Sequence, residues 1–116
     1  MSEISYRIKH LGIRTDSMEE ARQLAVILSA LLDLGDVKEM PTACWAGELF
    51  EVMGSDIRGA RGHVALQTDD VEAAMEAMRA KGVEFDESSI RRDEEGKIRF
   101  VYLKLELFGF QFHLTT

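Results

Sequence analysis

Gly62-His63-Val64-Ala65-Leu66-Gln67-Thr68-Asp69-Asp70-Val71-Glu72-Ala73-Ala74 decides the fold, because the chain contains a version of this stretch twice. The other copy, His10-Leu11-Gly12-Ile13-Arg14-Thr15-Asp16-Ser17-Met18-Glu19-Glu20-Ala21, lies 53 residues earlier. At this offset His10 aligns with His63. The other matched pairs are Thr15/Thr68, Asp16/Asp69, Glu19/Glu72 and Ala21/Ala74. A repeat of this kind indicates one supersecondary unit used twice. We therefore predict two copies of one unit, each opening with a histidine on a strand.

The first copy begins with a strand and a helix. Residues 4–13 alternate as a strand, with His10 on one face and Leu11 and Ile13 on the other. Asp16 and Glu19 predict a helix start with a capping box, and Gly35 predicts its end just after Asp33. The apolar residues in between have helical spacing and form one predicted buried stripe: Met18, Ala21, Leu24, Ala25, Leu28, Leu31 and Leu32.

The rest of the first copy is less regular. We predict an irregular strand over 37–45 and a clearer strand over 48–53, which carries Glu51. A glycine-punctuated connector over 54–62 closes this copy. Module one is therefore expected over about residues 4–54.

The second copy repeats the order of elements. Asp69 and Glu72 predict the next helix start, and Gly82 predicts its end. A short strand is expected over 83–85, then a polar solvated loop over 86–97 with a hairpin turn near Glu95-Gly96. Two further strands are expected over 98–105 and 110–115, joined by a turn at Gly109. Module two is expected over about 62–116, within one domain spanning 1–116.

Composition sets the class of protein. With 46% hydrophobic residues the chain can bury a core. A net charge of −7 with no basic run argues against a nucleic-acid partner. No apolar run reaches the roughly 18 residues needed to cross a membrane, and the N-terminal segment lacks the pattern of a signal peptide. The single cysteine, Cys44, suits a reducing compartment. We expect a cytoplasmic protein.

The two modules should leave one face of the sheet without helices. The helices must cover the face that carries Leu11 and Ile13, so His10 and His63 lie on the opposite, uncovered face. Such a face, lined with His, Glu and Gln, predicts a cleft or an interface. All three histidines of the chain lie on predicted strands at equivalent ends of the modules, and Glu51 holds in module one the place that His113 holds in module two.

Four segments carry a resemblance to a known family: residues 10–13, 50–52, 62–66 and 109–114. Over essentially its whole length the chain resembles the vicinal oxygen chelate superfamily, which includes glyoxalases, extradiol dioxygenases, fosfomycin-resistance proteins and bleomycin-resistance proteins. The resemblance implies an α+β fold, in which two βαβββ modules form a curled mixed sheet around a cleft.

The resemblance also implies a metal site at His10, Glu51, His63 and His113. The fourth position is commonly a glutamate that also acts as a base, and here it is His113. Histidine can bind a metal and move protons, so His113 and Glu51 are the catalytic candidates. Imidazole and carboxylate ligands suit Zn, Ni, Fe, Co or Mn rather than Ca or Mg.

Several other polar residues are candidates for substrate binding. Arg58 and Arg61 in the connector can bind a carboxylate or phosphate, although a solvated loop is the commoner outcome. Gln67 and Gln111 point to the same side as the histidines and either bind substrate or only line the cleft. Phe100 and Tyr102 are expected in the core or at an interface.

Two classes of function follow. The first is a glyoxalase-like, metal-dependent lyase or isomerase that chelates a small oxygenated substrate through two oxygens and transfers a proton; an extradiol-type dioxygenase is a variant of it. The second is a metal-free protein that binds or sequesters a ligand, as bleomycin-resistance proteins do. We also expect a homodimer, because sheet edges invite pairing, with His10 and Glu51 of one chain meeting His63 and His113 of the other.

Overall fold

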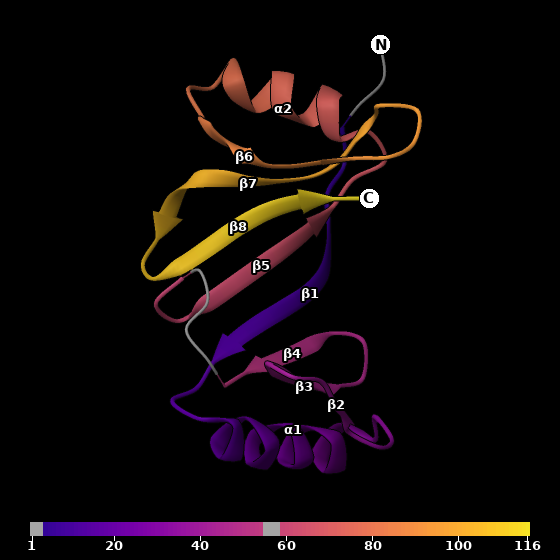
Figure 1. Ribbon diagram of the computed structural model, residues 1–116, viewed down its shortest axis with the longest axis vertical. Helices are drawn as coiled ribbons and strands as arrows, with labels where there is room; N and C mark the ends of the chain where they lie inside the picture. The colour runs from indigo at the N-terminus through magenta and orange to yellow at the C-terminus, as the bar shows by residue number, and fades with distance from the viewer. Residues whose placement is uncertain (1–3, 55–58) are drawn as a thin grey trace.

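The computed structural model describes residues 4–54 and 59–116 and contains the predicted βαβββ unit twice (Figure 1). The first unit comprises β1 (Arg7–Arg14), α1 (Met18–Leu32), β2 (Lys38–Glu39), β3 (Ala43–Ala46) and β4 (Phe50–Met53). The second comprises β5 (Gly62–Gln67), α2 (Val71–Arg79), β6 (Phe85–Arg92), β7 (Ile98–Leu107) and β8 (Phe110–Thr115). The two helices begin at Met18 and Val71, which repeats the offset between His10 and His63. The predicted fold is confirmed.

One eight-stranded sheet joins the two units, in the order β2-β3-β4-β1-β5-β8-β7-β6. Strand β1 pairs in parallel with β4 and antiparallel with β5, so the β1–β5 pair is the junction between the modules. Strand β5 pairs in parallel with β8. Figure 1 shows α1 and α2 at opposite ends of the molecule, with the sheet between them.

Each helix packs on its own module, which gives two separate cores. In the first, Ala21 and Ala25 of α1 pack against Cys44, Ala46 and Val52, all fully buried. The second is formed by α2, β6, β7 and β8; its buried members are Val71, Ala74, Met75, Phe85, Val101, Leu103 and Leu114. Of the described helices, neither is long and apolar enough to cross a membrane.

Both helices begin one residue later than predicted. The cap of α1 is Ser17, whose Oγ accepts a hydrogen bond from the Glu20 backbone N–H, and the Glu20 carboxylate accepts one from the Asp16 N–H. The cap of α2 is Asp70, which accepts from the Ala73 N–H. At both starts an adjacent residue offers the same capping chemistry, so the sequence pattern fits either position.

The helix α1 ends where it was predicted to end, but its buried face differs from the prediction. Asp33 ends the helix in a left-handed conformation, two residues before Gly35. Leu31 and Leu32, expected in the core, are 73% and 51% exposed. The buried positions of α1 are the small residues Ala21, Ala25 and Ser29. The buried face of the helix is therefore narrower than the stripe of apolar residues in its sequence.

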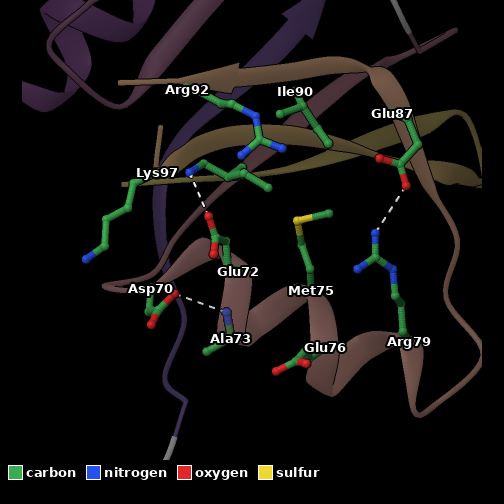
Figure 2. A pocket seen from close by; sticks show the side chains of 11 residues that line it. Asp70, Glu72, Ala73, Met75, Glu76, Arg79, Glu87, Ile90, Arg92 and Lys97 are labelled. Carbon is green, nitrogen blue, oxygen red and sulfur yellow. Dashed lines mark hydrogen bonds and ion pairs between the residues drawn. The ribbon is translucent and has the colours of Figure 1, made fainter. Parts of the chain in front are cut away.

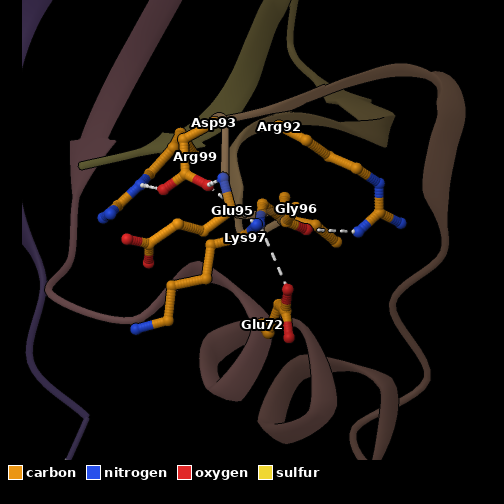
Figure 3. A network of polar contacts seen from close by, with 8 residues as sticks. Glu72, Arg92, Asp93, Glu95, Gly96, Lys97 and Arg99 are labelled. Carbon is orange, nitrogen blue, oxygen red and sulfur yellow. Dashed lines mark hydrogen bonds and ion pairs between the residues drawn. The ribbon is translucent and has the colours of Figure 1, made fainter.

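The prediction of a polar loop over 86–97 is wrong for most of its length. Residues 85–92 form strand β6, and the turn is confined to 93–97. Asp93 closes this turn: its carboxylate accepts from the backbone N–H groups of Glu95 and Lys97 and from Arg99 (Figure 3). Strand β6 lies at the edge of the sheet, where polar residues are common. Its mostly polar side chains therefore show no strand pattern in the sequence.

The side chain of Gln111 forms hydrogen bonds to the backbone of the sheet. The β7–β8 register shifts between Tyr102 and Glu106, and there the Gln111 Nε2 donates to the carbonyls of Leu103 at 2.6 Å and Leu105 at 3.5 Å. Gln111 is buried. Its amide therefore satisfies carbonyl groups that the irregular ladder leaves open.

Gln111→Ala should lower the free energy of unfolding by about 1–3 kcal/mol, because buried carbonyls lose their donor. Urea denaturation measures this change. Gln67→Ala, at a half-buried residue of β5, is the matched control and should change stability by less than about 0.5 kcal/mol. Equal stability of the two variants would contradict this role of Gln111.

Candidate metal centre

The centre of the site is the position of Gly12 in β1. Gly12 pairs with His63 of β5 on one side and with Glu51 of β4 on the other. A Cβ atom at Gly12 would lie 2.2 Å from Cε1 and 2.3 Å from Nδ1 of His63. The His63 ring therefore fills the space that a side chain would take.

Because Gly12 has no side chain, donor atoms from three neighbouring strands meet over β1. His63 Nε2 lies 3.1 Å from Glu51 Oε1 and 3.1 Å from His10 Nε2. The His10 Nε2 to Glu51 Oε1 distance is 3.6 Å. The structure thus brings together three of the four predicted ligands, from β1, β4 and β5.

His113 approaches from β8, which carries it opposite Ala65 of β5. Its ring centroid is 5.4 Å from that of His63 and 5.6 Å from that of His10. One nitrogen from each of the three histidines lies within 4.8 Å of the others. The three histidines therefore converge, and Glu51 lies against two of them, His10 and His63.

These donors fit a divalent transition metal. Two donors bound to one ion at about 2.1 Å, at tetrahedral or octahedral angles, are about 3.0–3.4 Å apart, close to the separations seen here. Within the described residues, the Nδ1 atoms of His63 and His113 are buried with no hydrogen-bond partner, and the nitrogen that His63 turns toward His10 and Glu51 is Nε2. Imidazole and carboxylate together suit Zn, Ni, Fe, Co or Mn.

His10 and His113 are held in the form that binds metals. Burial, reinforced by the neighbouring His63 and His10, lowers the pKa of His113 to about 3. Burial also lowers the pKa of His10, although the nearby Glu51 carboxylate opposes this. Both rings are therefore neutral at pH 7, as ligation requires.

The expectation that two chains share each site is corrected. His10, Glu51, His63 and His113 meet within one chain, because β1 and β5 of the same chain pair directly. The homodimer itself stays a prediction, and each of its chains would hold a complete set of ligands.

The four candidate ligands line a cavity of about 260 Å³, together with Lys9, Arg91, Phe100 and Tyr102. A second cavity, of about 410 Å³, also borders Lys9 and His10 and extends to Trp45 and Lys38. Aromatic rings surround the histidines: Phe100 lies 4.5 Å and Tyr102 5.2 Å from His113, and Trp45 lies 5.2 Å from His10. This wall shields the centre from solvent.

Sequence reasoning missed several of these residues. Lys9 was not singled out, because alternation puts neighbouring strand residues on opposite faces. The β1–β5 register shifts between Ile8 and His10, and Lys9 and His10 both border the cavity. Phe100 and Tyr102 were expected in the core or at an interface and instead form its wall. Arg91 was hidden in the segment predicted to be a loop. An irregularity in a strand has no reliable sequence signal.

The three predicted substrate-binding residues that the structure describes lie outside both cavities. Arg61, Gln67 and Gln111 are not among the residues that line either cavity. Arg61 is exposed beside Gly109, and the Gln111 amide is bonded to backbone carbonyls. Arg58 lies outside the described residues.

A larger cavity, of about 560 Å³, lies between α2 and the β6–β7 hairpin (Figure 2). Its charged groups are used within the fold: Arg79 pairs with Glu87, Glu72 accepts from the Ile98 N–H, and Arg92 donates to the Gly96 carbonyl. None of the four candidate ligands lines it. The chemistry therefore belongs to the smaller cavity.

Gly12→Ala should destabilise the protein by about 1–3 kcal/mol, the usual cost of forcing extra volume into a packed site. The cost should fall sharply in the His63→Ala background, because the ring that the new methyl group meets is gone. A double-mutant cycle in urea measures this coupling. Additive effects of the two substitutions would show that His63 does not occupy the space over Gly12.

The untagged protein should bind one divalent transition-metal ion. His63→Ala and His113→Ala should each weaken binding more than about 100-fold, since even outer-shell partners contribute roughly 10- to 100-fold. Elemental analysis measures the metal content, with Gln67→Ala as the control. Unchanged metal content in both histidine variants would refute the assignment.

Metal affinity should also depend on pH. Protons compete for imidazole nitrogens, so affinity should fall in acid. Because the pKa values of His10 and His113 are lowered, the fall attributable to these two rings should come below the ordinary histidine value of about 6.5. Titrations between pH 8 and pH 5 measure it, and a loss of affinity that is complete above pH 6.5 would contradict the neutral state of these rings.

Comparison with known proteins gives a likeness in structure only. No protein-family model and no curated protein matches the sequence. A hypothetical protein from Bacillus halodurans superimposes with a TM-score of 0.58 at 14% identity, over 96% of this chain and 94% of the other.

Two enzymes are similar in the same way. Methylmalonyl-CoA epimerase from Streptomyces coelicolor, in complex with 2-nitronate-propionyl-CoA, has a TM-score of 0.55 at 18% identity, over 95% of this chain and 96% of the other. The epimerase from Mycobacterium tuberculosis has a TM-score of 0.55 at 14% identity, over 93% and 85%. These likenesses establish the fold: the chain has the fold of the vicinal oxygen chelate superfamily, to which methylmalonyl-CoA epimerases belong.

Proposed function

We propose that this chain is a metal-dependent isomerase or lyase that acts on a small oxygenated substrate. The observation that carries the proposal is the close triangle of His10, His63 and Glu51 donor atoms, with His113 beside it, at the wall of a cavity. Two of its structural neighbours are methylmalonyl-CoA epimerases, which supports isomerase chemistry in particular.

The protein groups have separate tasks in this proposal. His10, His63 and Glu51 would hold the ion, and His113 would complete the set. A bound divalent ion supplies Lewis-acid stabilisation of negative charge on two neighbouring substrate oxygens. Phe100, Tyr102 and Trp45 would limit access of water to the reacting atoms.

A carboxylate is the better base for the proton step. The pKa of about 3 makes the neutral His113 ring a weak proton acceptor at pH 7. Glu51 turns Oε1 toward the two histidines, which leaves Oε2 for a proton. Glu51 would take a proton from the carbon next to the substrate carbonyl. Return of a proton to the opposite face of that carbon would give the epimer, return to the same face would regenerate the substrate, and loss of a leaving group from the adjacent carbon would instead give the product of a lyase.

The extradiol-type alternative is favoured by one observation. Two histidines and one carboxylate at a single point are the ligand set of non-haem iron(II) oxygenases, and His10, His63 and Glu51 form such a set. In that case His113 would stay unligated and act on the substrate.

Deuterium exchange tests the proposal. In D2O, the metal-loaded protein should exchange the α-proton of some members of a panel of small oxo acids, hydroxy acids and acyl thioesters that includes methylmalonyl-CoA. NMR follows the loss of the proton signal. Chelation of the metal should abolish exchange, and Glu51→Gln should slow it by at least about 100-fold, the low end of general-base contributions.

The controls separate the alternatives. Gln67→Ala should exchange at the wild-type rate. Oxygen uptake with catechol by the iron(II)-loaded protein would instead support the dioxygenase. Failure of the wild-type protein to bind any metal would refute both and favour the ligand-sequestering class.

A further inference from the structure

Arg91 of β6 is a cation at the wall of the candidate metal centre. It pairs with Phe100 in the β6–β7 register, and its guanidinium carbon lies 4.8 Å from the centroid of the Phe100 ring. The Phe100 ring in turn lies 4.5 Å from His113. After burial and the other two histidines, the charge of Arg91 contributes to lowering the pKa of His113, which places the guanidinium within electrostatic reach of this ligand.

This arginine has no carboxylate partner in the described part of the chain, unlike several others on the surface. The arginines with such partners are Arg7 with Asp69, Arg22 with Glu39, Arg79 with Glu87, and Arg99 with Asp93. Stacking on Phe100 restrains the guanidinium while its N–H groups stay available. An anion from outside the chain can therefore bind these N–H groups of Arg91.

The charged residues at the cavity also favour the binding of an anion. Among the residues that the structure describes, two cations, Lys9 and Arg91, border the cavity, against one carboxylate, Glu51. Lys9 is brought there by the irregularity in β1 and donates to the Thr116 carbonyl at 2.8 Å. A chain of net charge −7 thus concentrates positive charge at its candidate site, and such a concentration attracts anions.

We propose, on the basis of the proposed function, that Arg91 determines substrate specificity by binding a carboxylate of the substrate. The planar guanidinium matches a carboxylate with two parallel hydrogen bonds. A cavity of about 260 Å³ limits the group at the metal ligands to a small one. The substrate class is therefore a small organic acid, or an acyl group with a free carboxylate, whose neighbouring oxygens reach the metal ligands.

Two hydroxamates test this inference without any turnover. Acetohydroxamate offers two adjacent oxygens to a metal, and the monohydroxamate of malonate offers the same pair plus one carboxylate. Both are titrated into the cobalt(II)-loaded full chain, and visible absorption of the ion reports binding. The wild-type protein should prefer the carboxylate-bearing probe by roughly ten- to one-hundred-fold, as expected for charged hydrogen bonds.

Substitutions assign the preference to one residue. Arg91→Gln should bring the affinity ratio of the two probes close to one and leave acetohydroxamate binding unchanged, and Arg91→Lys should retain part of the ratio. Arg92→Gln is the matched control: it removes the same charge one residue away, from a side chain that lines the cavity beside α2 (Figure 2). It should keep the wild-type ratio.

The outcomes separate the two proposals. If cobalt and acetohydroxamate bind but the ratio is near one in the wild type, or falls equally in both glutamine variants, the role of Arg91 is wrong and the metal-dependent function stands. If cobalt does not bind, the proposed function fails and this inference fails with it.

Discussion

The missing side chain at Gly12 is the constraint on which the candidate site depends. Neighbouring strands are about 4.8 Å apart, so Glu51 on β4 and His63 on β5 are separated by the full width of β1. Their side chains meet at 3.1 Å only because the position between them is empty. The pairing of β1 with both strands thus converts two distant backbone positions into one pair of donors, and His10 and His113 are then placed beside this pair.

The repeat and the strand patterns allowed the fold to be predicted, whereas the four candidate ligands followed from the resemblance to the vicinal oxygen chelate superfamily. The offset of 53 residues placed His10 and His63 at equivalent points and gave both helices correctly to within one or two residues at their starts. Alternation placed Glu51 on the face of β4 that meets the histidines. These features depend on local periodicity, which a sequence displays directly.

What the sequence did not reveal depends on pairing between distant segments. The shift beside Lys9 and the role of Gln111 at a break in the β7–β8 ladder arise from strand register, which no single strand encodes. Strand β6 lacked an alternating pattern, so Arg91 was placed in a loop. Closure of the site within one chain likewise depends on β1 pairing with β5 of its own chain rather than that of another.

The two separate cores have a consequence for how the protein unfolds. Each module has its own helix and its own buried cluster, and the sheet connects them through the β1–β5 pair. His10 and Glu51 come from one module, and His63 and His113 from the other. An ion that binds all four is bound only while both modules are folded, so its binding free energy is shared between them. Occupancy of the site would therefore couple the unfolding of one half of the chain to that of the other.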